Sequence, residues 1–525
     1  MDASLSLIDE GLPPAVPPRF NLAAHVLAGM ARRPGHVALE ILAPDGTVRR
    51  WRHGEIVAAI EAADAFFRRR LSPGSRVLLR LGNSVRFPIA FLGAIRAGMV
   101  PVPLSAQLTA CEVGTVADDI APALALVDPD LPLPQLEVPV LPEDELPTES
   151  ECRHPPAPTA ADAPAYIVFT SGSTGRPRAV VHAHRAILAR QMMHRDWYDL
   201  RPNDRLLHAG AFNWTFTLGT GLMDPWSVGA TALIPAPGTP PDALALLAGR
   251  GGATILAAVP GIYRKMLKEP RPIPSLRHGL AAGESLLPTL RNAWRETTGT
   301  DIHEALGMSE ISTFISGSPA RPAPRAAVGF AQRGRRVAIL DPDTPSRILP
   351  RGEVGMLAVS RRDPGLFLGY LGAESETRIR FHAEWFLTGD LASLDETGAF
   401  RHHGRADDMM NAGGYRVFPR EVEEALATHP GIAEVAVTDI EVKPGVRIIA
   451  AFCVPKEGTA PGRDEIVAIA SKRLAVYKRP RRVVFLDALP RSANGKIDRR
   501  RLATLGRRGT AGEPADRHTS TGKGS

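Results

Sequence analysis

The sequence predicts an α/β protein, with a large N-terminal domain of layered α/β subdomains and a small, mobile α+β C-terminal domain. A chain of 525 residues is too long for one ordinary domain. Strand and helix patterns alternate to about residue 340, which is typical of a parallel or mixed sheet. A composition break follows at GRADD, residues 404–408. We therefore expect domains at 1–404 and 405–505, and a disordered tail rich in Gly, Ser and Thr at 506–525.

In the first part of the chain, short apolar runs that end at turns indicate strands, and longer runs with helical periodicity lie between them. Residues 129–163 hold many prolines and acids, so we expect them to form a surface connection. The expected strands are 77–81, 100–104, 123–127 and 166–169, and the expected helices are 88–97 and 186–194.

The same alternation continues beyond residue 200, and residues 335–400 then become rich in strands and turns. A separate small unit with its own helices and strands follows residue 404. The expected strands are 230–234, 254–259, 279–283, 434–437, 448–454 and 483–486, and the expected helices are 288–297, 419–428 and 464–474.

Composition excludes several classes of protein. A formal net charge of +7 is mild for this length and is not a nucleic-acid signature. Cys111, Cys152 and Cys453 are far apart and odd in number, so we expect neither a disulfide framework nor a zinc site, and a reducing cytosol fits. The start of the chain is acidic, and the best apolar run, 87–104, is broken by Arg96 and by prolines. We therefore expect a cytoplasmic protein without a membrane span.

The nine residues from Thr170 to Arg178 have the composition of a phosphate-binding loop. They comprise two Thr, two Ser, two Gly, one Pro and two Arg, and they follow an apolar strand directly. Small side chains let backbone N–H groups face outward, while hydroxyls and arginines add donors and charge. The Walker pattern GxxxxGK[ST] does not occur. The alternative is a polar turn between two strands.

Five further motifs follow the loop in order. They are Ala282-Gly283-Glu284, the run EALGMSE at 304–310, WFLTGD ending at Asp390 with Gly404-Arg405 after it, NAGGYRV at 411–417, and LPRSANGK ending at Lys496. With the loop, they resemble the adenylate-forming superfamily, which includes acyl- and aryl-CoA synthetases, nonribosomal peptide adenylation domains and luciferases. The resemblance covers about residues 30–502.

The resemblance implies an ATP site in the large domain. Glu310 would hold Mg²⁺, which prefers carboxylate and phosphate oxygens, and Asp390 and Arg405 would bind the ribose. Thr170, Glu310 and Lys496 would be catalytic. Arg178, Leu306 and Ser309 stand where the family usually has Lys, Tyr and Thr. The other expected nucleotide contacts are Ser171, Gly172, Ser173, Thr174, Gly175, Gly283, Glu284, Glu304, Ala305, Gly307 and Met308.

The resemblance also implies a second reaction step in the small domain. Asp407 matches the hinge about which that domain swings, and a hinge residue need only absorb backbone rotation. Gly414 would border the pantetheine tunnel of coenzyme A, and Arg416 would face the phosphates. Lys496 matches the lysine of the adenylation step. The cofactors and substrates implied are ATP, Mg²⁺ and coenzyme A, and the product is an acyl-CoA formed through an acyl-adenylate.

The acid pocket of the family is lined by a segment that matches AFNWTFTLG, residues 211–219. Its side chains, Phe212 and Trp214 among them, are apolar and aromatic, and none is basic. Gly307 stands where acetate-specific relatives carry Trp, so we expect open space there. The chain is most similar to the benzoate-CoA ligase and short- or medium-chain acyl-CoA synthetase branch. An aromatic or short- to medium-chain carboxylic acid is therefore the expected substrate.

Two alternatives stay open at this point. One is a standalone adenylation enzyme that loads a carrier protein, and the other is a non-catalytic nucleotide-binding protein. The expected partners are a small carboxylic acid, ATP and CoA, with no nucleic acid. A homodimer, and a lysine acetyltransferase that modifies Lys496, are further expectations.

Overall fold

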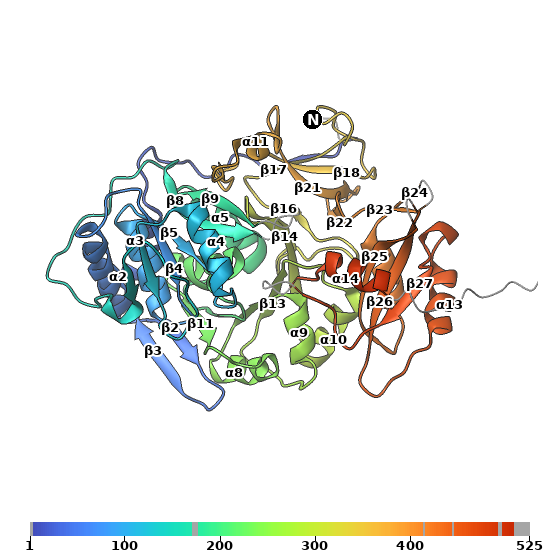
Figure 1. Cartoon of the computed structure of the whole chain (residues 1–525), viewed down its shortest axis with the longest axis horizontal. Coiled ribbons are helices and arrows are strands. Elements are labelled where there is room, and N and C mark those ends of the chain that lie inside the picture. The colour runs from blue at the N-terminus through green and yellow to red at the C-terminus, as the bar shows by residue number, and fades with distance from the viewer. Residues whose placement is uncertain (1–3, 171–176, 413–414, 444–445, 492–495, 509–525) are drawn as a thin grey trace, which may run out of the picture. The chain divides into compact units, whose positions relative to one another are not determined.

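The computed structural model describes residues 4–170, 177–412, 415–443, 446–491 and 496–508 (Figure 1). The chain divides into two compact units, residues 1–402 and 403–525, close to the boundary expected at 404–405. Each unit is described by itself. No helix among the described residues is both long enough and apolar enough to cross a membrane.

The largest sheet of the first unit has nine strands, and its centre is parallel. Strands β2, β11, β10, β12, β13 and β14 pair in parallel, and antiparallel strands extend both edges. This arrangement confirms the mixed sheet expected from the alternating pattern. The order is β16 (Phe330–Ala331), β15 (Ser312–Ser316), β14 (Ile302–Met308), β13 (His278–Ala282), β12 (Ile255–Ala258), β10 (Arg205–His208), β11 (Thr231–Pro235), β2 (Val37–Leu42) and β3 (Val48–Arg52).

Three smaller sheets complete the first unit. One is all parallel, and the other two are antiparallel. The parallel sheet has the order β5 (Val100–Pro103), β4 (Arg76–Arg80), β6 (Leu124–Val127) and β7 (Val140–Pro142). The first antiparallel sheet has the order β19 (Gly369–Tyr370), β9 (Arg178–Ala183) and β8 (Pro164–Thr170). The second has the order β1 (Leu7–Asp9), β17 (Arg336–Leu340), β18 (Gly355–Ser360), β21 (Trp385–Leu394) and β20 (Phe381–His382), and β22 (Phe400–Arg405) pairs with β21.

The helices begin and end at local sequence signals. Helix α10 (Pro288–Thr298) starts on a proline, whose fixed φ suits a first turn, and stops at Gly299, whose φ is +71°. It buries Leu290 and Trp294 on one face. The other helices are α1 (Leu22–Ala31), α2 (His53–Arg68), α3 (Arg86–Arg96), α4 (Ala110–Ile120), α5 (Ala186–Met193), α6 (Thr215–Leu218), α7 (Asp224–Val228), α8 (Leu244–Arg250), α9 (Pro260–Met266) and α11 (Glu374–Arg378), with π turns η2 (His194–Tyr198) and η3 (Gly219–Met223).

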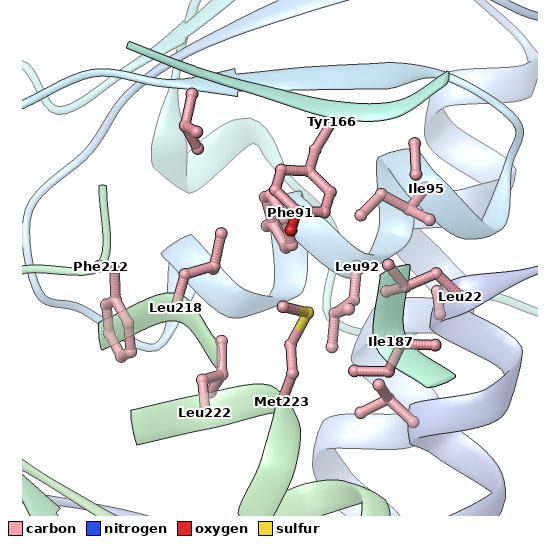
Figure 2. Packing of buried hydrophobic residues seen from close by; sticks show 14 of the residues in the cluster. Leu22, Phe91, Leu92, Ile95, Tyr166, Ile187, Phe212, Leu218, Leu222 and Met223 are labelled. Carbon is pink, nitrogen blue, oxygen red and sulfur yellow. The ribbon is translucent and has the colours of Figure 1, made fainter. Parts of the chain in front are cut away.

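A continuous apolar core joins the strand before the loop to the helices around it (Figure 2). Tyr166 of β8 meets Phe91 of α3 edge-on, with ring centroids 5.6 Å apart. Phe87 stacks on Phe212 at 5.0 Å. The aromatic segment after β10 is thereby packed against α3.

The second unit is a small α+β structure, as expected. Leu502 of α14 is fully buried, so the helix packs on the sheet. The expected tail at 506–525 is wrong in its first three residues, because α14 continues to Arg508, and the rest lies outside the described residues. The elements are β23 (Met410–Ala412), β24 (Tyr415–Val417), α12 (Pro419–Leu426), β25 (Ile432–Lys443), β26 (Val446–Pro455), α13 (Arg463–Arg473), β27 (Arg482–Phe485) and α14 (Arg499–Arg508).

Candidate active site

The strand order of the nine-stranded sheet indicates a binding site at the carboxyl ends of its parallel strands. Strand β10 pairs with β11 on one side and with β12 on the other, so the order of the chain reverses at β10. In open α/β sheets, ligands bind outside the carboxyl ends of the strands at such a point. The residues that follow β10, β13 and β14 carry three of the sequence motifs.

The phosphate-loop motif begins in β8 and ends in β9, two strands that pair antiparallel. Thr170 at the end of β8 lies opposite Arg178 at the start of β9, and residues 171–176, between them, lie outside the described residues. A guanidinium nitrogen of Arg178 lies 2.6 Å from a carboxylate oxygen of Glu376. The same guanidinium lies over the ring of Tyr370, 5.2 Å from its centroid. Arg178 is therefore fixed by two residues outside the loop.

The turn after β13 brings two motifs together. Gly283 has a φ of +91°, which favours glycine. A Cβ at Gly283 would lie 3.1 Å from the Trp214 ring, so the backbone and the indole are in close contact. Trp214 is half-buried and follows β10. The structure thus brings an expected acid-pocket residue beside the expected adenine turn.

The carboxylate of Glu304 in β14 has two partners in the protein. Its carboxylate accepts a hydrogen bond from the backbone N–H of Leu286 at 3.0 Å and lies 3.5 Å from the guanidinium of Arg291. Both partners belong to the segment that follows Gly283. Glu304 therefore anchors the Gly283 turn to β14, and its direct contact with a nucleotide stays a prediction, as does that of Glu284 in the same turn.

Ser309 and Glu310 form the turn between β14 and β15. The hydroxyl of Ser309 lies 3.4 Å from that of Thr215, which follows Trp214. The Tyr370 hydroxyl donates to Oε1 of Glu310 at 2.7 Å, and the Phe367 N–H donates to the Glu310 carbonyl at 2.8 Å. Sequence reasoning placed Thr215 only in the expected acid-pocket segment, and it did not find Tyr370. Ala305, Leu306 and Met308 lie in β14 just before the turn.

A single carboxylate at this turn suits a divalent cation that arrives with phosphates. No group of three or more His, Cys, Asp or Glu side chains in the described part of the chain could hold a metal. Mg²⁺ is usually bound by one or two carboxylates together with substrate phosphates and water, so Glu310 fits Mg²⁺ carried by ATP.

Asp390 is placed by its neighbours in β21. Gly389 has a φ of +80°, and the hydroxyl of Thr388 accepts from the Asp390 N–H at 3.0 Å. Nε2 of His402 lies 3.1 Å from Oδ1 of Asp390. Asp390 is almost completely buried, with 6% of its surface exposed. His402 is a neighbour of the expected ribose contact that the sequence reasoning missed.

The described residues include only part of the motifs of the second unit. Lys496 is exposed, and its neighbour Ile497 forms an antiparallel bridge with Arg491. Arg405 ends β22, and Asp407 is exposed. Gly414 and the side chain of Arg416 lie outside the described residues, although the backbone of Arg416 belongs to β24.

The start of the expected acid wall, residues 211–219, is hydrogen-bonded by the side chain of Asn83. The Asn83 amide donates to the Gly210 carbonyl at 3.1 Å, and its oxygen accepts from the Phe212 N–H at 3.1 Å. Asn83 follows β4, the strand at which the four-stranded sheet reverses its order. Phe212 is 1% exposed in the core, whereas Trp214 keeps an exposed edge. Contact of Phe212 with an acid stays a prediction.

The expectation that Gly307 leaves open space is wrong. The register of β14 and β15 shifts between Leu306 and Gly307, which is a bulge. A Cβ at Gly307 would lie 2.3 Å from the Ser312 carbonyl oxygen and 2.5 Å from the Thr313 Cα. The glycine is required because two backbones approach each other closely. A larger side chain at 307 cannot fill a pocket without first moving this backbone.

We expect Gly307→Ala to lower the free energy of unfolding by about 1–3 kcal/mol, the usual cost of overpacking. The matched control is Gly249→Ala in α8, where an added Cβ meets nothing within 4 Å. Alanine should stabilise that exposed helical position slightly. Denaturant unfolding of both variants measures the difference, and equal stability of the two would contradict the close approach at Gly307.

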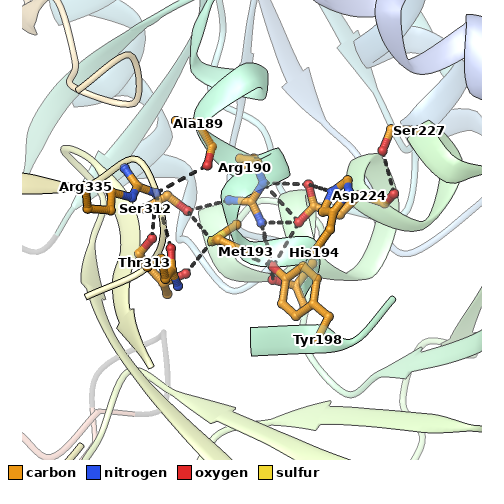
Figure 3. A network of polar contacts seen from close by, with 12 residues as sticks. Ala189, Arg190, Met193, His194, Tyr198, Asp224, Ser227, Ser312, Thr313 and Arg335 are labelled. Carbon is orange, nitrogen blue, oxygen red and sulfur yellow. Dashed lines mark hydrogen bonds and ion pairs between the residues drawn. The ribbon is translucent and has the colours of Figure 1, made fainter. Parts of the chain in front are cut away.

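A buried ionic network connects the segment 211–219 to the strand that follows Glu310 (Figure 3). Arg190 of α5 donates to Asp224 at 2.6 and 2.9 Å and to the Ser312 hydroxyl at 2.5 Å. Although burial raises the pKa of Asp224, the Arg190 guanidinium brings that pKa to about 2. A Cβ at Gly219 would overlap Cζ of Arg190 at 1.9 Å, so the guanidinium lies flat on that backbone. Arg190 thus joins the end of segment 211–219 to the strand after Glu310.

The chain matches two family descriptions, AMP-binding enzyme over residues 27–371 and AMP-binding enzyme C-terminal domain over residues 421–496. It is 30% identical to a 3-hydroxybenzoate–CoA ligase of Aromatoleum sp. (strain CIB), over 88% of this chain and 92% of that protein. It is 31% identical to a benzoate–CoA ligase of Thauera aromatica, over 95% and 99%. Among solved structures it is similar to an anthranilate CoA ligase in complex with anthranoyl-AMP, with a TM-score of 0.84, 26% identity, and coverage of 94% and 99%.

Proposed function

We propose, from the premise that this chain belongs to the AMP-binding enzyme family, that it joins an aromatic carboxylic acid to coenzyme A at the expense of ATP. It is an acid–thiol ligase of the AMP-forming type, and ATP and CoA are its co-substrates. The observation that carries the site assignment is that Trp214, which follows the strand where the sheet order reverses, lies against Gly283, while its neighbour Thr215 lies 3.4 Å from Ser309.

In the first step, a carboxylate oxygen of the acid attacks the α-phosphorus of ATP. A phosphorus–oxygen bond forms, the bond to the β-phosphate oxygen breaks, and pyrophosphate leaves. Charge develops on the phosphates, so the rate depends on positioned donors and cations. We assign those roles to the hydroxyl loop that begins at Thr170, to Arg178 and Ser309, and to Lys496. Mg²⁺ held by Glu310 would neutralise part of the charge when it is bound.

In the second step, the CoA sulfur attacks the acyl carbon of the adenylate. A carbon–sulfur bond forms, AMP leaves, and the thiol proton is released. We propose that the second unit serves both steps by turning about Asp407, with Lys496 used in the first and the Gly414 segment in the second. Asp390 and Arg405 bind the ribose in this scheme, and Arg416 binds phosphate.

We infer that the acid is aromatic from the side chains of the expected acid wall, residues 211–219. Residues 211–219 contain no Lys or Arg that would pair with a second carboxylate. The indole ring of Trp214 lies beside Gly283, and an apolar ring suits an aromatic acid. The similar proteins named above act on benzoate, 3-hydroxybenzoate and anthranilate, which share that ring. A short or medium alkyl acid is the second candidate.

We expect pyrophosphate release with benzoate, hydroxybenzoates and anthranilate to exceed release with acetate or hexanoate. The measurement is pyrophosphate formed over this panel, with and without CoA, together with acyl-CoA detected by mass spectrometry. Stimulation by CoA and formation of benzoyl-CoA support the ligase. Adenylate formation without thioester would favour the enzyme that loads a carrier protein, and no pyrophosphate with any acid would favour a non-catalytic nucleotide-binding protein.

We also propose a location, an oligomeric state and a modification for this enzyme. We propose a cytoplasmic location, which agrees with the three cysteines, all of them free thiols. A homodimer and a lysine acetyltransferase that modifies Lys496 are also proposed. Lys496 is exposed, as a modification site must be, and acetylation would remove its charge.

A further inference from the structure

The hydroxyl of Tyr370 makes a short hydrogen bond to the carboxylate of Glu310. The distance from the phenolic oxygen to Oε1 is 2.7 Å, and both residues are buried, with exposed fractions of 4% and 8%. The phenolic O–H donates this bond, and Oε1 accepts it.

Oε2 is the oxygen of Glu310 that this bond leaves available. No hydrogen bond to Oε2 occurs within the described ranges, which omit residues 171–176 of the neighbouring loop. The Glu310 backbone is held as well, because its carbonyl accepts from the Phe367 N–H three residues before Tyr370. The segment 367–370 thus fixes both the position of Glu310 and the rotation of its carboxylate.

The ring of Tyr370 also contacts the other phosphate-binding segment. The Arg178 guanidinium lies over it and is paired with Glu376 of α11. The Tyr370 N–H in turn donates to the Thr377 hydroxyl at 2.9 Å, again in α11. Tyr370 therefore lies between the end of the loop and the Glu310 turn and touches one residue of each.

We propose that Tyr370 is a positioning residue for the metal: its hydroxyl orients the Glu310 carboxylate so that Oε2 is presented to the Mg²⁺ that accompanies ATP. The inference rests on the proposed function, and it adds a residue that no sequence motif indicated. A partner that orients a metal-binding carboxylate acts through that ligand, and losing such a partner typically costs 10- to 100-fold in metal affinity.

Tyr370→Phe removes one oxygen atom and keeps the ring under Arg178. We expect the Mg²⁺ concentration that half-saturates ATP binding to rise about 10-fold or more. Calorimetric titration of ATP into the full-length enzyme at a series of MgCl₂ concentrations measures this without turnover. The matched control is Tyr263→Phe, because the Tyr263 hydroxyl donates to the carbonyls of Leu256 and Leu280, away from Glu310. It should lower the unfolding temperature and leave the Mg²⁺ dependence unchanged.

A second variant separates positioning from stability. Glu310→Gln removes the carboxylate charge, so adding Tyr370→Phe to it should change the Mg²⁺ dependence by less than twofold. An unchanged Mg²⁺ requirement in Tyr370→Phe, or an equal shift in both tyrosine variants, would overturn the proposal. If the parent enzyme itself shows no Mg²⁺-dependent ATP binding, the proposed function fails and this inference fails with it. A parent that needs Mg²⁺ and a Tyr370→Phe variant that needs no more would refute the role of Tyr370 alone.

Discussion

Replacing Lys496 by alanine is expected to slow acyl-adenylate formation by a factor of about a hundred or more, the effect of losing one group that stabilises developing charge. The second half-reaction, in which supplied acyl-adenylate and CoA give acyl-CoA, should keep its rate. The two half-reactions differ because the lysine is assigned to the phosphate chemistry alone. The measurements are pyrophosphate release and thioester formation in separate assays.

Lys456→Ala is the matched control, since Lys456 is another exposed lysine of the second unit. It should leave both half-reactions unchanged. Lys496 is exposed too, so its loss should alter the unfolding temperature little. An equal loss in both half-reactions would contradict the assignment of Lys496 to one step.

The strands and helices that could be predicted are those with their own apolar periodicity. The expected elements between residues 77 and 127 match β4, α3, β5 and β6 within one or two residues. Strand β3 was missed because VRRWR is polar and largely exposed, and its pairing with β2 makes it a strand. Helix α14 was missed for a similar reason. Its sequence RRRLATLGRR is mostly charged, and the contact of Leu502 with the sheet stabilises it.

The site motifs were predictable as local patterns, but the residues that hold them were not. Thr170 and Arg178 lie opposite each other because β8 and β9 pair antiparallel, and nearness in sequence predicts that. Asn83 binds a loop more than a hundred residues away, and Tyr370 binds Glu310 across 60 residues. Such contacts depend on strand order. At Gly307 the prediction itself was wrong. The glycine suggested open space, but it is required because two backbones approach each other at a bulge.

The second large effect is expected at Arg190. Arg190→Met removes the only cation that contacts the Asp224 carboxylate with two nitrogens in the described structure, and it leaves that carboxylate fully buried. Breaking one partner out of a buried ion pair costs about 3–5 kcal/mol. We expect the free energy of unfolding of the first unit to fall by that amount. Denaturant unfolding followed by tryptophan fluorescence measures it.

Two further variants test why Arg190→Met should lower the free energy of unfolding. Arg295→Met removes an exposed partner of Asp301, whose 3.0 Å ion pair should contribute less than about 1 kcal/mol. The double variant Arg190→Met with Asp224→Asn carries no buried charge at this place. It should recover part of the stability, because much of the single-variant loss comes from a buried carboxylate that has lost its guanidinium partner. If the double variant were less stable than Arg190→Met by the full cost of Asp224→Asn alone, the two residues would be independent. The Arg190 contacts to Ser312 and Gly219 would then account for the whole effect, and the ion pair for none of it.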